Sequence, residues 1–224
     1  SIQTPGVLAV AASADAAVLM LQWVEPATDE RLGNAFYESF ARQLAELHRA
    51  TSPKGQFGWP EGTFCGVTPQ ANGWMKSWPA FYRDRRLVPQ LELARQNFPH
   101  ADLLHELGGR LLIRVASLLD YPARPSLIHG DLWSGNVLCD RSGRPVLIDP
   151  ASSFSDREAE FGMLTLFGGL PPRFYEVYQE VWPLADGWRE RVDLYQLYHL
   201  LNHLNLFGES YLGRCLAIMK RYAG

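Results

Sequence analysis

The segment from Leu127 to Ala151, LIHGDLWSGNVLCDRSGRPVLIDPA, gathers polar side chains of the kinds that carry out chemistry. Asp131 lies in a glycine-containing loop, Asn136 follows five residues later, and Asp149 follows a second apolar run. An amide oxygen beside a carboxylate is a pair of hard oxygen ligands. This pair suits Mg²⁺, because the ion takes one or two protein oxygens together with phosphate oxygens and water. A further carboxylate nearby can accept the proton of a hydroxyl group.

The apolar runs NVLC and PVLID flank Asp140–Arg144, and this arrangement predicts a β-hairpin. A turn centred on Ser142–Gly143 would place Asn136 opposite Asp149 at the open end of the hairpin, on one face of the sheet. A one-residue bulge would loosen that register, and three-residue turns with glycine commonly contain one. Asp131 would lie at the same end, which is the layout of a kinase catalytic loop and its metal-binding Asp.

These three residues together predict phosphoryl transfer, although each alone would suit a turn, where Asp and Asn bond to nearby backbone. In this hypothesis Asp131 accepts the proton of a substrate hydroxyl, while Asn136 and Asp149 hold Mg²⁺ on the phosphates of ATP. Positioning and neutralisation of charge would supply most of the rate.

The composition of the 224 residues argues against several other classes of protein. Acidic residues outnumber basic ones, 24 to 21, and no long basic run occurs, so we expect no nucleic-acid partner. No apolar run approaches the roughly 20 residues that cross a bilayer, and no signal peptide is evident, so we expect no membrane association. The cysteines Cys65, Cys139 and Cys215 are widely spaced without a C-x-x-C pair, which favours reduced thiols in a cytoplasmic protein.

The first of the predicted elements that must position the polar residues is a small β-sheet near the start of the chain. Residues 7–24 predict two short apolar strands around a turn at 13–16. The nearly continuous run AVLMLQWV suits a strand covered on both faces or an early helix, and its Val and Trp content favours the strand. Thr28 or Asp29 can cap a helix that reaches about Thr51. Its apolar residues recur at spacings of three and four, at Leu32, Phe36, Phe40, Leu44 and Leu47.

The remainder of the chain is mostly helical in pattern. Residues 52–73 lack a period and predict a long loop. Helices are expected over residues 77–96, 101–119, 157–167, 172–181, 189–207 and 211–222. Strands, helices, a hairpin and more helices do not alternate as a doubly wound fold would, so the sequence predicts an α+β fold that is mostly α.

The motif HGDLWSGN followed by IDP resembles the kinase-like small-molecule phosphotransferases, which include aminoglycoside and choline kinases. Its Trp and Ser resemble the fructosamine (ketosamine) kinases in particular. Further similarity lies in RQLAELHRATS, WMKSWPAFYRDRRLVPQLELA, DPASSFSDREAEF, LFGGLPPRFYEVYQEVWPL and YQLYHLLNHLNLFG. The resemblance implies a protein-kinase-like C-terminal lobe of the aminoglycoside phosphotransferase type. It also implies ATP-dependent phosphorylation of the 3-hydroxyl of a sugar joined to an amine by glycation, in protein deglycation.

Carried over by motif, the resemblance assigns roles to residues at each part of the site. It implies that Asp131 is the base, that His129 orders the loop, and that Asn136 and Asp149 bind Mg²⁺. The segment LQWV resembles the hinge between two lobes, where the backbone would meet adenine at Gln22, Trp23 and Val24. Candidate sugar-binding residues are Trp133, His199, Asn202 and His203.

The sequence departs from the family pattern at two places. The first lysine is Lys54, and neither a phosphate-covering loop nor a phosphate-binding lysine precedes the hinge. Residues 1–24 therefore resemble the remnant of an N-terminal ATP-binding lobe, residues 25–224 the catalytic lobe, and we expect little ATP turnover by this chain alone. Glu160 stands where the family implies an Asp that bonds the catalytic loop, and Glu158 or Asp156 could share that role.

Several alternatives stay open at the level of sequence. His199 and His203 are spaced for zinc on one helical face, but the catalytic Glu of H-E-x-x-H and a third ligand are missing. A kinase for an aminoglycoside or choline, or an inactive sugar-binding module, would share most of the motif. Core packing is expected for Trp74, Trp78, Phe81 and Tyr82, a solvated helix face for Arg83, Arg85 and Arg86, and burial for Cys65 and Cys139.

Overall fold

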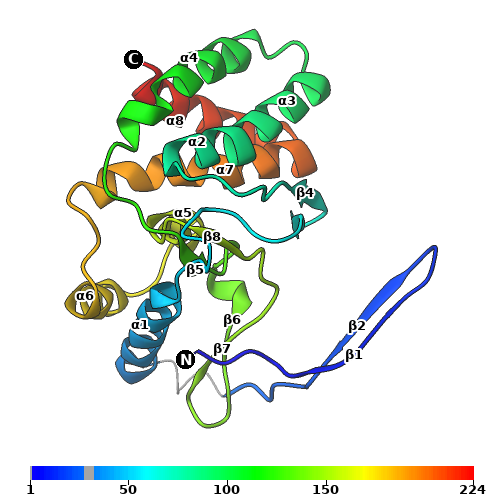
Figure 1. The fold of residues 1–224 in the computed structure, drawn as a ribbon, viewed down its shortest axis with the longest axis vertical. Coiled ribbons are helices and arrows are strands. Elements are labelled where there is room, and N and C mark those ends of the chain that lie inside the picture. Colours follow the sequence, from blue (N-terminus) through cyan, green and yellow to red (C-terminus); the bar gives the residue numbers. More distant parts are fainter. Residues whose placement is uncertain (1, 28–32) are drawn as a thin grey trace.

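The computed structural model describes residues 2–27 and 33–224, and most of its elements are helices (Figure 1). The α-helices in this part of the chain are α1 (Asn34–Arg49), α2 (Trp78–Tyr82), α3 (Val88–Asn97), α4 (Asp102–Leu118), α5 (Glu158–Leu166), α6 (Pro172–Val181), α7 (Trp188–Phe207) and α8 (Leu212–Ala223). The strands form antiparallel pairs: β1 (Val7–Ala12) with β2 (Ala17–Leu21), β3 (Thr63–Cys65) with β4 (Thr68–Gln70), β5 (Ser126–Ile128) with β8 (Ser153–Ser155), and β6 (Val137–Cys139) with β7 (Pro145–Leu147). The predicted α+β, mostly α class is confirmed.

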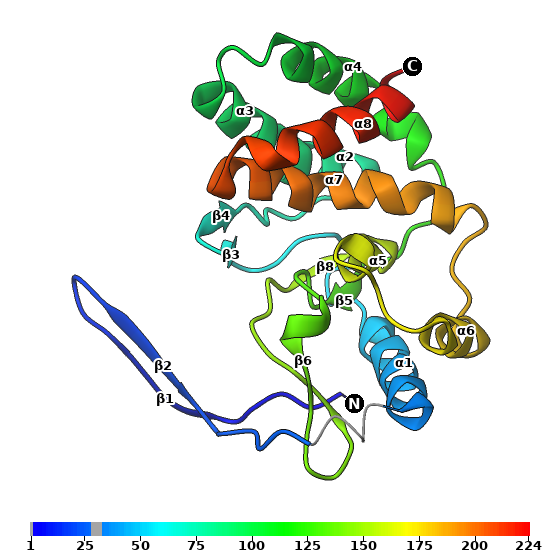
Figure 2. The ribbon, with the colours of Figure 1, turned by 180° about the vertical axis from the view of Figure 1, so that it is seen from behind.

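Two groups of helices enclose two apolar cores. Helices α2, α3, α4, α7 and α8 surround one core, whose fully buried side chains include Leu104, Leu111, Leu197, Leu201 and Met219. Helices α1, α5 and α6 surround the other, with Phe40, Phe161, Phe174 and Tyr178. Helix α5 contributes side chains to both cores, and in both views it lies with the β5–β8 pair between α7 and α1 (Figures 1 and 2). The polar residues of the 127–151 segment therefore lie where the two groups meet.

Helix α1 follows the predicted apolar stripe. Phe36, Phe40 and Leu44 are buried and Leu47 is half-buried, because residues three and four apart share one face of a helix. The same stripe continues to His48, which is fully buried. The proposed caps Thr28 and Asp29, like Leu32, lie outside the described residues.

The β1–β2 hairpin confirms the two predicted strands but not their expected burial. Val10 and Val18 expose 72% and 57% of their surface, and both strands are exposed along nearly their whole length. The Ser13 hydroxyl accepts the backbone N–H of Ala16 (3.2 Å) and closes the turn. The hairpin extends as an arm away from the helices (Figures 1 and 2), so the expected cover on both faces is wrong for the described residues.

The segment predicted as a single helix over residues 77–96 is interrupted by a π-helical turn at Arg83–Leu87. Val88 N–H bonds to the carbonyl of Arg83, five residues back, and Pro89 has no N–H with which to continue an α pattern. The predicted long loop at 52–73 also contains the β3–β4 hairpin, whose strands are too short to show a period.

Arg86 corrects the expected solvated helix face, because it is only 5% exposed. Its guanidinium donates to the carbonyl of Ala71 (2.8 Å), to Asn72 Oδ1 (2.9 Å) and to Ser153 Oγ (3.2 Å). Arg83, by contrast, pairs with its neighbour Asp84 near the surface. A buried arginine with neutral acceptors ties the β4 side of the long loop to β8.

The expected packing of the aromatic residues and cysteines is largely confirmed. Trp78, Phe81 and Tyr82 are buried, whereas Trp74 is half-buried beneath the ammonium group of Lys54. The three cysteines are buried and form no disulfide. No helix among the described residues is long and apolar enough to cross a membrane.

The β6–β7 hairpin forms as predicted, with a register one residue from the expected one. Val137 pairs with Leu147, and the N–H of Ile148 donates to the carbonyl of Asn136 (3.1 Å). Asn136 thus lies opposite Ile148, and Asp149 lies one residue beyond it. The expected direct pairing of Asn136 with Asp149 is wrong.

The turn of this hairpin explains the shift. The carboxylate of Asp140 accepts the backbone N–H groups of Ser142 (2.8 Å) and Arg144 (3.0 Å), and Asp140 N–H donates to the carbonyl of Arg144 (2.9 Å). Three residues then form the loop, and Gly143 takes the left-handed conformation with φ of 83°. This is the three-residue turn with a left-handed glycine, in which a bulge changes the register.

Candidate functional site

The carboxylate of Glu160 on α5 binds the backbone of the loop between β5 and β6. Backbone N–H of His129 donates to Glu160 Oε2 (2.6 Å), and backbone N–H of Gly130 donates to Oε1 (2.9 Å). Each carboxylate oxygen therefore holds one amide of the loop, and the side chain is fully buried. Glu160 itself, and not Asp156 or Glu158, performs the role that sequence analysis left open.

Glu160 is held in turn by His48 at the end of α1. His48 Nε2 lies 3.5 Å from Glu160 Oε2, and His48 Nδ1 lies 2.7 Å from the hydroxyl of Tyr178. Burial lowers the pKa of His48, so we assign a neutral ring that donates from Nε2 and accepts the Tyr178 hydroxyl at Nδ1. Burial raises the pKa of the Glu160 carboxyl, but the hydrogen bonds from the His48 ring and from the backbone N–H of His129 act against burial, and the net pKa is lowered.

The ring of His129 sets the conformation of the next residues. Its Nε2 lies 2.7 Å from the carbonyl of Ile148 and must donate to it. The lone pair of Nδ1 then accepts the backbone N–H of Asp131 (3.3 Å). His129 thus connects the loop to the end of β7.

Gly130 cannot carry a side chain. Its φ is 83°, and a Cβ atom would lie 2.3 Å from the carbonyl oxygen of Ala151. The Ala151 N–H also donates to the carbonyl of His129 (2.9 Å). The loop that carries Asp131 therefore packs directly against the backbone that follows Asp149. The glycine between His129 and Asp131 is therefore required by geometry.

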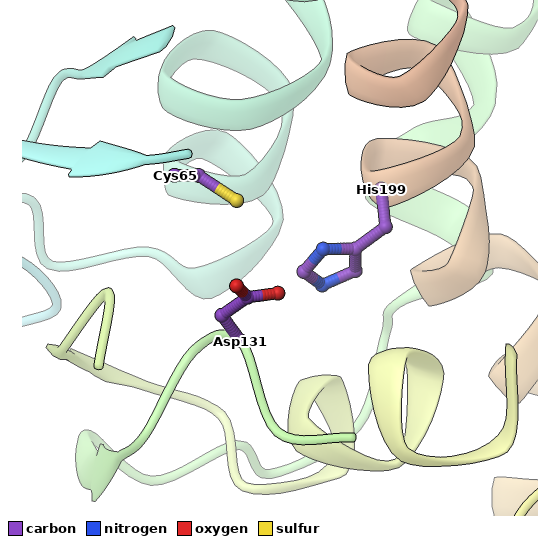
Figure 3. A group of neighbouring side chains, drawn as sticks. All are labelled: Cys65, Asp131 and His199. Carbon is purple, nitrogen blue, oxygen red and sulfur yellow. The ribbon is translucent and has the colours of Figure 1, made fainter. Parts of the chain in front are cut away.

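The carboxylate of Asp131 points away from this support and toward α7 and β3. Its oxygen, the Cys65 sulfur and a His199 ring nitrogen all lie within 4.8 Å of one another (Figure 3). Burial raises the pKa of Asp131, while positive charge on His129 and His203 would lower it and the negative charges of Glu160 and Asp149 raise it further; the net pKa is raised. A raised pKa makes this carboxylate a better proton acceptor.

Asn136 and Asp149 supply oxygen donors beside Asp131. Asn136 is buried, and its Nδ2 donates to the carbonyl of Asp131 (2.9 Å), which leaves its Oδ1 without a hydrogen bond among the described residues. Asp149 is exposed and takes a left-handed φ of 52°, the one positive φ outside glycine in the described chain. A non-glycine residue in this region costs energy, and such positions cluster at functional sites.

An aromatic surface extends from the loop toward the end of α7. The Trp133 ring meets Phe167 edge-on at 6.0 Å, and Phe167 meets His203 at 5.5 Å. His203 further contacts Phe207 and Tyr211, at 5.5 and 5.1 Å. We call Trp133, Phe167, His203, Phe207 and Tyr211 the aromatic wall. Several of its members are exposed, although burial is the usual state of large aromatic side chains.

Gly135 makes room for the Trp133 ring. A Cβ atom at Gly135 would lie 2.4 Å from two carbon atoms of the indole. Trp133, one of the candidate sugar-binding residues, exposes 37% of its surface beside the loop.

The three predicted residues of α7 lie near Asp131 but do not have equal access to a ligand. His199 is buried beside Asp131, whereas His203 Nδ1 lies 2.6 Å from the carbonyl of His199 in its own helix. Asn202 accepts from Gln90 Nε2 (3.0 Å) and donates to the carbonyl of Cys65 (3.2 Å). Both ends of the Asn202 amide thus make hydrogen bonds that hold β3 against α7.

The predicted hinge residues lie beside the turn of the β6–β7 hairpin, at the end away from the Asp131 loop. Gln22 N–H donates to the carbonyl of Gly6 (2.8 Å), and Trp23 is 79% exposed. The backbone of Val24 makes no hydrogen bond with the described residues. A cavity of about 310 Å³ separates this segment from the turn at Asp140–Arg144. Of the three residues, Trp23 and Val24 have backbone amides that make no hydrogen bond with the described residues.

Sequence reasoning missed His48, Cys65 and Phe167 as parts of the site. His48 had a signal, since it continues the apolar stripe of α1 where a histidine is unexpected. Cys65 and Phe167 had none, because they reach the loop from segments about 65 and 35 residues away in the sequence. Their proximity comes from tertiary packing alone.

The chain has the fold of a choline kinase. The crystal structure of a choline kinase from Streptococcus pneumoniae superimposes with a TM-score of 0.64 at 15% identity, over 98% of this chain and 74% of that one. At this identity the likeness concerns the fold alone.

Comparisons at higher sequence identity identify the family. The sequence model of fructosamine kinase matches residues 1–223, and the chain belongs to this family. A provisionally named ketoamine kinase of Enterococcus faecium is 38% identical over 212 residues, 94% of this chain and 73% of that protein. The crystal structure of a provisionally named fructosamine-3-kinase from Thermobifida fusca superimposes with a TM-score of 0.84 at 36% identity, over 96% of this chain and 72% of the other.

Proposed function

We propose that this protein is an ATP-dependent kinase that transfers a phosphoryl group to a sugar hydroxyl of a ketosamine, such as a fructosamine or ribulosamine. Family membership supports the reaction type, and the ketoamine and fructosamine in the names of its relatives support the substrate class. The observation that carries the proposal is the Asp131 carboxylate. It is half-buried, has a raised pKa, and stands on a loop whose backbone is fixed by Glu160.

In this mechanism Asp131 orients the attacking hydroxyl and accepts its proton as the bond to phosphorus forms. The carboxylate makes no hydrogen bond within the described protein, so both oxygens remain for a substrate. Its backbone is held on one side by His129 and on the other by Asn136. A fixed base within hydrogen-bond reach of the hydroxyl lowers the entropy cost of reaction.

The residues present fit a magnesium-bound nucleotide. Asn136 Oδ1 and the exposed carboxylate of Asp149 are hard oxygen donors, and neither accepts a hydrogen bond from the described residues. These two residues would hold the ion. When bound, Mg²⁺ neutralises the charge that develops on the phosphates.

The aromatic wall is suited to the amine side of a ketosamine. Trp133 and Phe167 offer exposed ring surface next to the loop, and the amine of such an adduct is cationic near neutral pH. A cation over an aromatic ring gains about 0.5–2 kcal/mol. The wall thus favours an amine-linked sugar over a free one, and His199 and His203 would face the sugar.

The division of the chain and its location belong to the same proposal. Residues 1–24 would form part of the nucleotide-side lobe and its hinge, and residues 25–224 the catalytic lobe. The backbone of Gln22, Trp23 and Val24 would meet adenine, and the amides of Trp23 and Val24 are free of hydrogen bonds to the described residues. A cytoplasmic location suits buried, reduced cysteines.

A substrate panel tests the proposal. The product of the complete reading frame is incubated with ATP and Mg²⁺ together with fructosyl-lysine, ribulosyl-lysine, an aminoglycoside or choline, and ADP and phosphorylated product are measured. We expect product from one or both ketosamines alone. Turnover of the aminoglycoside or choline in preference would refute the substrate assignment, and sugar binding without any ATP turnover would identify an inactive sugar-binding module.

A further inference from the structure

We propose that Cys65, Asp131 and His199 form a binding site for a zinc-class transition metal, distinct from the site for Mg²⁺. A sulfur, a carboxylate oxygen and a ring nitrogen from these residues lie within 4.8 Å of one another (Figure 3). They come from the end of β3, the loop after β5 and the middle of α7. Tertiary packing thus brings three ligand atoms from distant segments of the chain into one place.

The buried ring of His199 is the second observation that points to a ligand. Only 5% of the residue is exposed, and its Nδ1 is buried without any hydrogen-bond partner. A buried polar atom without a partner costs about 1–3 kcal/mol. Burial lowers the pKa of His199 to about 3, so the ring is neutral and a nitrogen lone pair is available to a metal.

Neighbouring polar residues do not show this pattern. His203 uses its Nδ1 on a helix carbonyl, and Asn202 uses both ends of its amide. The Asn202 bond to the carbonyl of Cys65 fixes the backbone that presents the thiol to the site. In Figure 3 the ring of His199, the carboxylate of Asp131 and the sulfur of Cys65 point into the same space.

The distances require only a small contraction. Zinc bonds of about 2.3 Å to sulfur and about 2.0–2.1 Å to nitrogen or oxygen place tetrahedral ligand atoms about 3.3–3.6 Å apart. The three donors would therefore close by about an ångström, within the reach of side-chain rotation. Three protein ligands leave a fourth position for water or a hydroxyl of the sugar.

The donor types select the metal. Thiolate and imidazole favour zinc and other late transition metals, whereas Mg²⁺ takes oxygen donors such as those of Asn136 and Asp149. Burial raises the pKa of the Cys65 thiol to about 12, so at neutral pH the thiol binds by releasing its proton to solvent as the metal–sulfur bond forms. No redox step is involved.

Occupation of the site would inhibit the kinase, and this consequence rests on the proposed function. A metal on the Asp131 carboxylate removes the proton acceptor from the reaction. Zinc would thus compete with the sugar hydroxyl for Asp131, and inhibition would persist in excess Mg²⁺.

Cobalt and zinc titrations test the site without turnover. The reduced protein, free of other metals, is titrated with CoCl₂, and the thiolate-to-cobalt charge-transfer band is recorded; ZnCl₂ then displaces the cobalt, and bound zinc is counted after dialysis. We expect one metal per chain. The variants Cys65→Ser and His199→Asn should each weaken zinc binding about tenfold or more, whereas Cys215→Ser, which changes a buried thiol on α8, should not.

Circular dichroism and thermal melting confirm that each variant is folded. A folded His199→Asn that binds zinc as tightly as wild type, or a wild type that shows no thiolate band, overturns the proposal. Zinc inhibition of ketosamine phosphorylation is measured separately in excess Mg²⁺. Binding without inhibition would leave the metal site in place and contradict the role of Asp131 as the base.

Discussion

Replacing Glu160 by glutamine perturbs the support of the loop without changing its shape. In the native protein the two carboxylate oxygens accept one backbone N–H each, from His129 at 2.6 Å and Gly130 at 2.9 Å. Glutamine keeps one oxygen and turns an NH₂ group toward the other backbone donor. Hydrogen bonds to a charged group contribute about 1.5–3 kcal/mol, and an unpaired buried N–H costs about 1–3 kcal/mol. We therefore expect Glu160→Gln to lower the free energy of unfolding by about 3 kcal/mol.

The same change should slow the reaction. Asp131 follows the two anchored amides directly, and a displacement of about 1 Å of a catalytic group can cost about a hundredfold in rate. We expect kcat to fall about ten- to a hundredfold. The pKa of Glu160 is lowered in the fold, so its stabilising effect is complete above the unfolded pKa of about 4.3 and is lost as the pH falls through the folded value. The difference between wild type and Glu160→Gln should therefore shrink in acid.

The assay is urea unfolding followed by tryptophan fluorescence, together with kcat at saturating substrates. Glu158→Gln is the matched control, because Glu158 is equally buried but pairs with Arg191 (2.8 and 2.9 Å) and does not touch the loop. It should lose stability and keep kcat. A Glu160→Gln variant with wild-type stability and kcat, or a Glu158→Gln variant with the same fall in kcat, would refute the reasoning.

Two further predictions concern Asp156 and Trp133. Burial raises the pKa of Asp156 to about 7, so the carboxyl keeps its proton in the fold while the unfolded chain loses it above about pH 4; stability therefore falls as the pH rises from about 4 to 7. Asp156→Asn can still accept the Glu158 N–H, which lies 2.7 Å from the carboxylate in the native protein. In urea unfolding, the free energy of unfolding of this variant relative to wild type should rise by up to about 3 kcal/mol from pH 5 to pH 8. The same difference in free energy at both pH values would contradict this. Trp133→Ala should raise the KM for the ketosamine about tenfold, a loss of about 1.4 kcal/mol, with little change in the KM for ATP; equal changes in both constants would indicate a folding role instead.

The local elements could be predicted because their signals are local. Apolar residues at spacings of three and four located α1, and paired apolar runs around a turn located the β6–β7 hairpin. The register of that hairpin could not be fixed, because the Asp140 carboxylate and the left-handed Gly143 decide the turn geometry. The register differs by one residue from the prediction, so Asn136 lies opposite Ile148 instead of Asp149.

Contacts between distant segments were beyond the sequence pattern. Arg86 looked like a solvent-facing residue in a basic cluster, yet its acceptors are a carbonyl and two side chains from other segments. Glu160 and His48 form a buried pair only because α1 and α5 pack together beneath the loop. The grouping of Asp131, Asn136 and Asp149 at one end of the hairpin could be predicted, because their spacing in the sequence is local.

The central claim is that Asp131 accepts the proton of the sugar hydroxyl, and the turnover of Asp131→Asn tests it most directly. Phosphorylated ketosamine is measured on the product of the complete reading frame, with ketosamine affinity determined in parallel by calorimetry. The exposed Asp120→Asn serves as the control. We predict that Asp131→Asn loses about 10²–10⁴-fold in kcat while its affinity for the ketosamine stays within about threefold of wild type. A kcat within about tenfold of wild type would contradict the account.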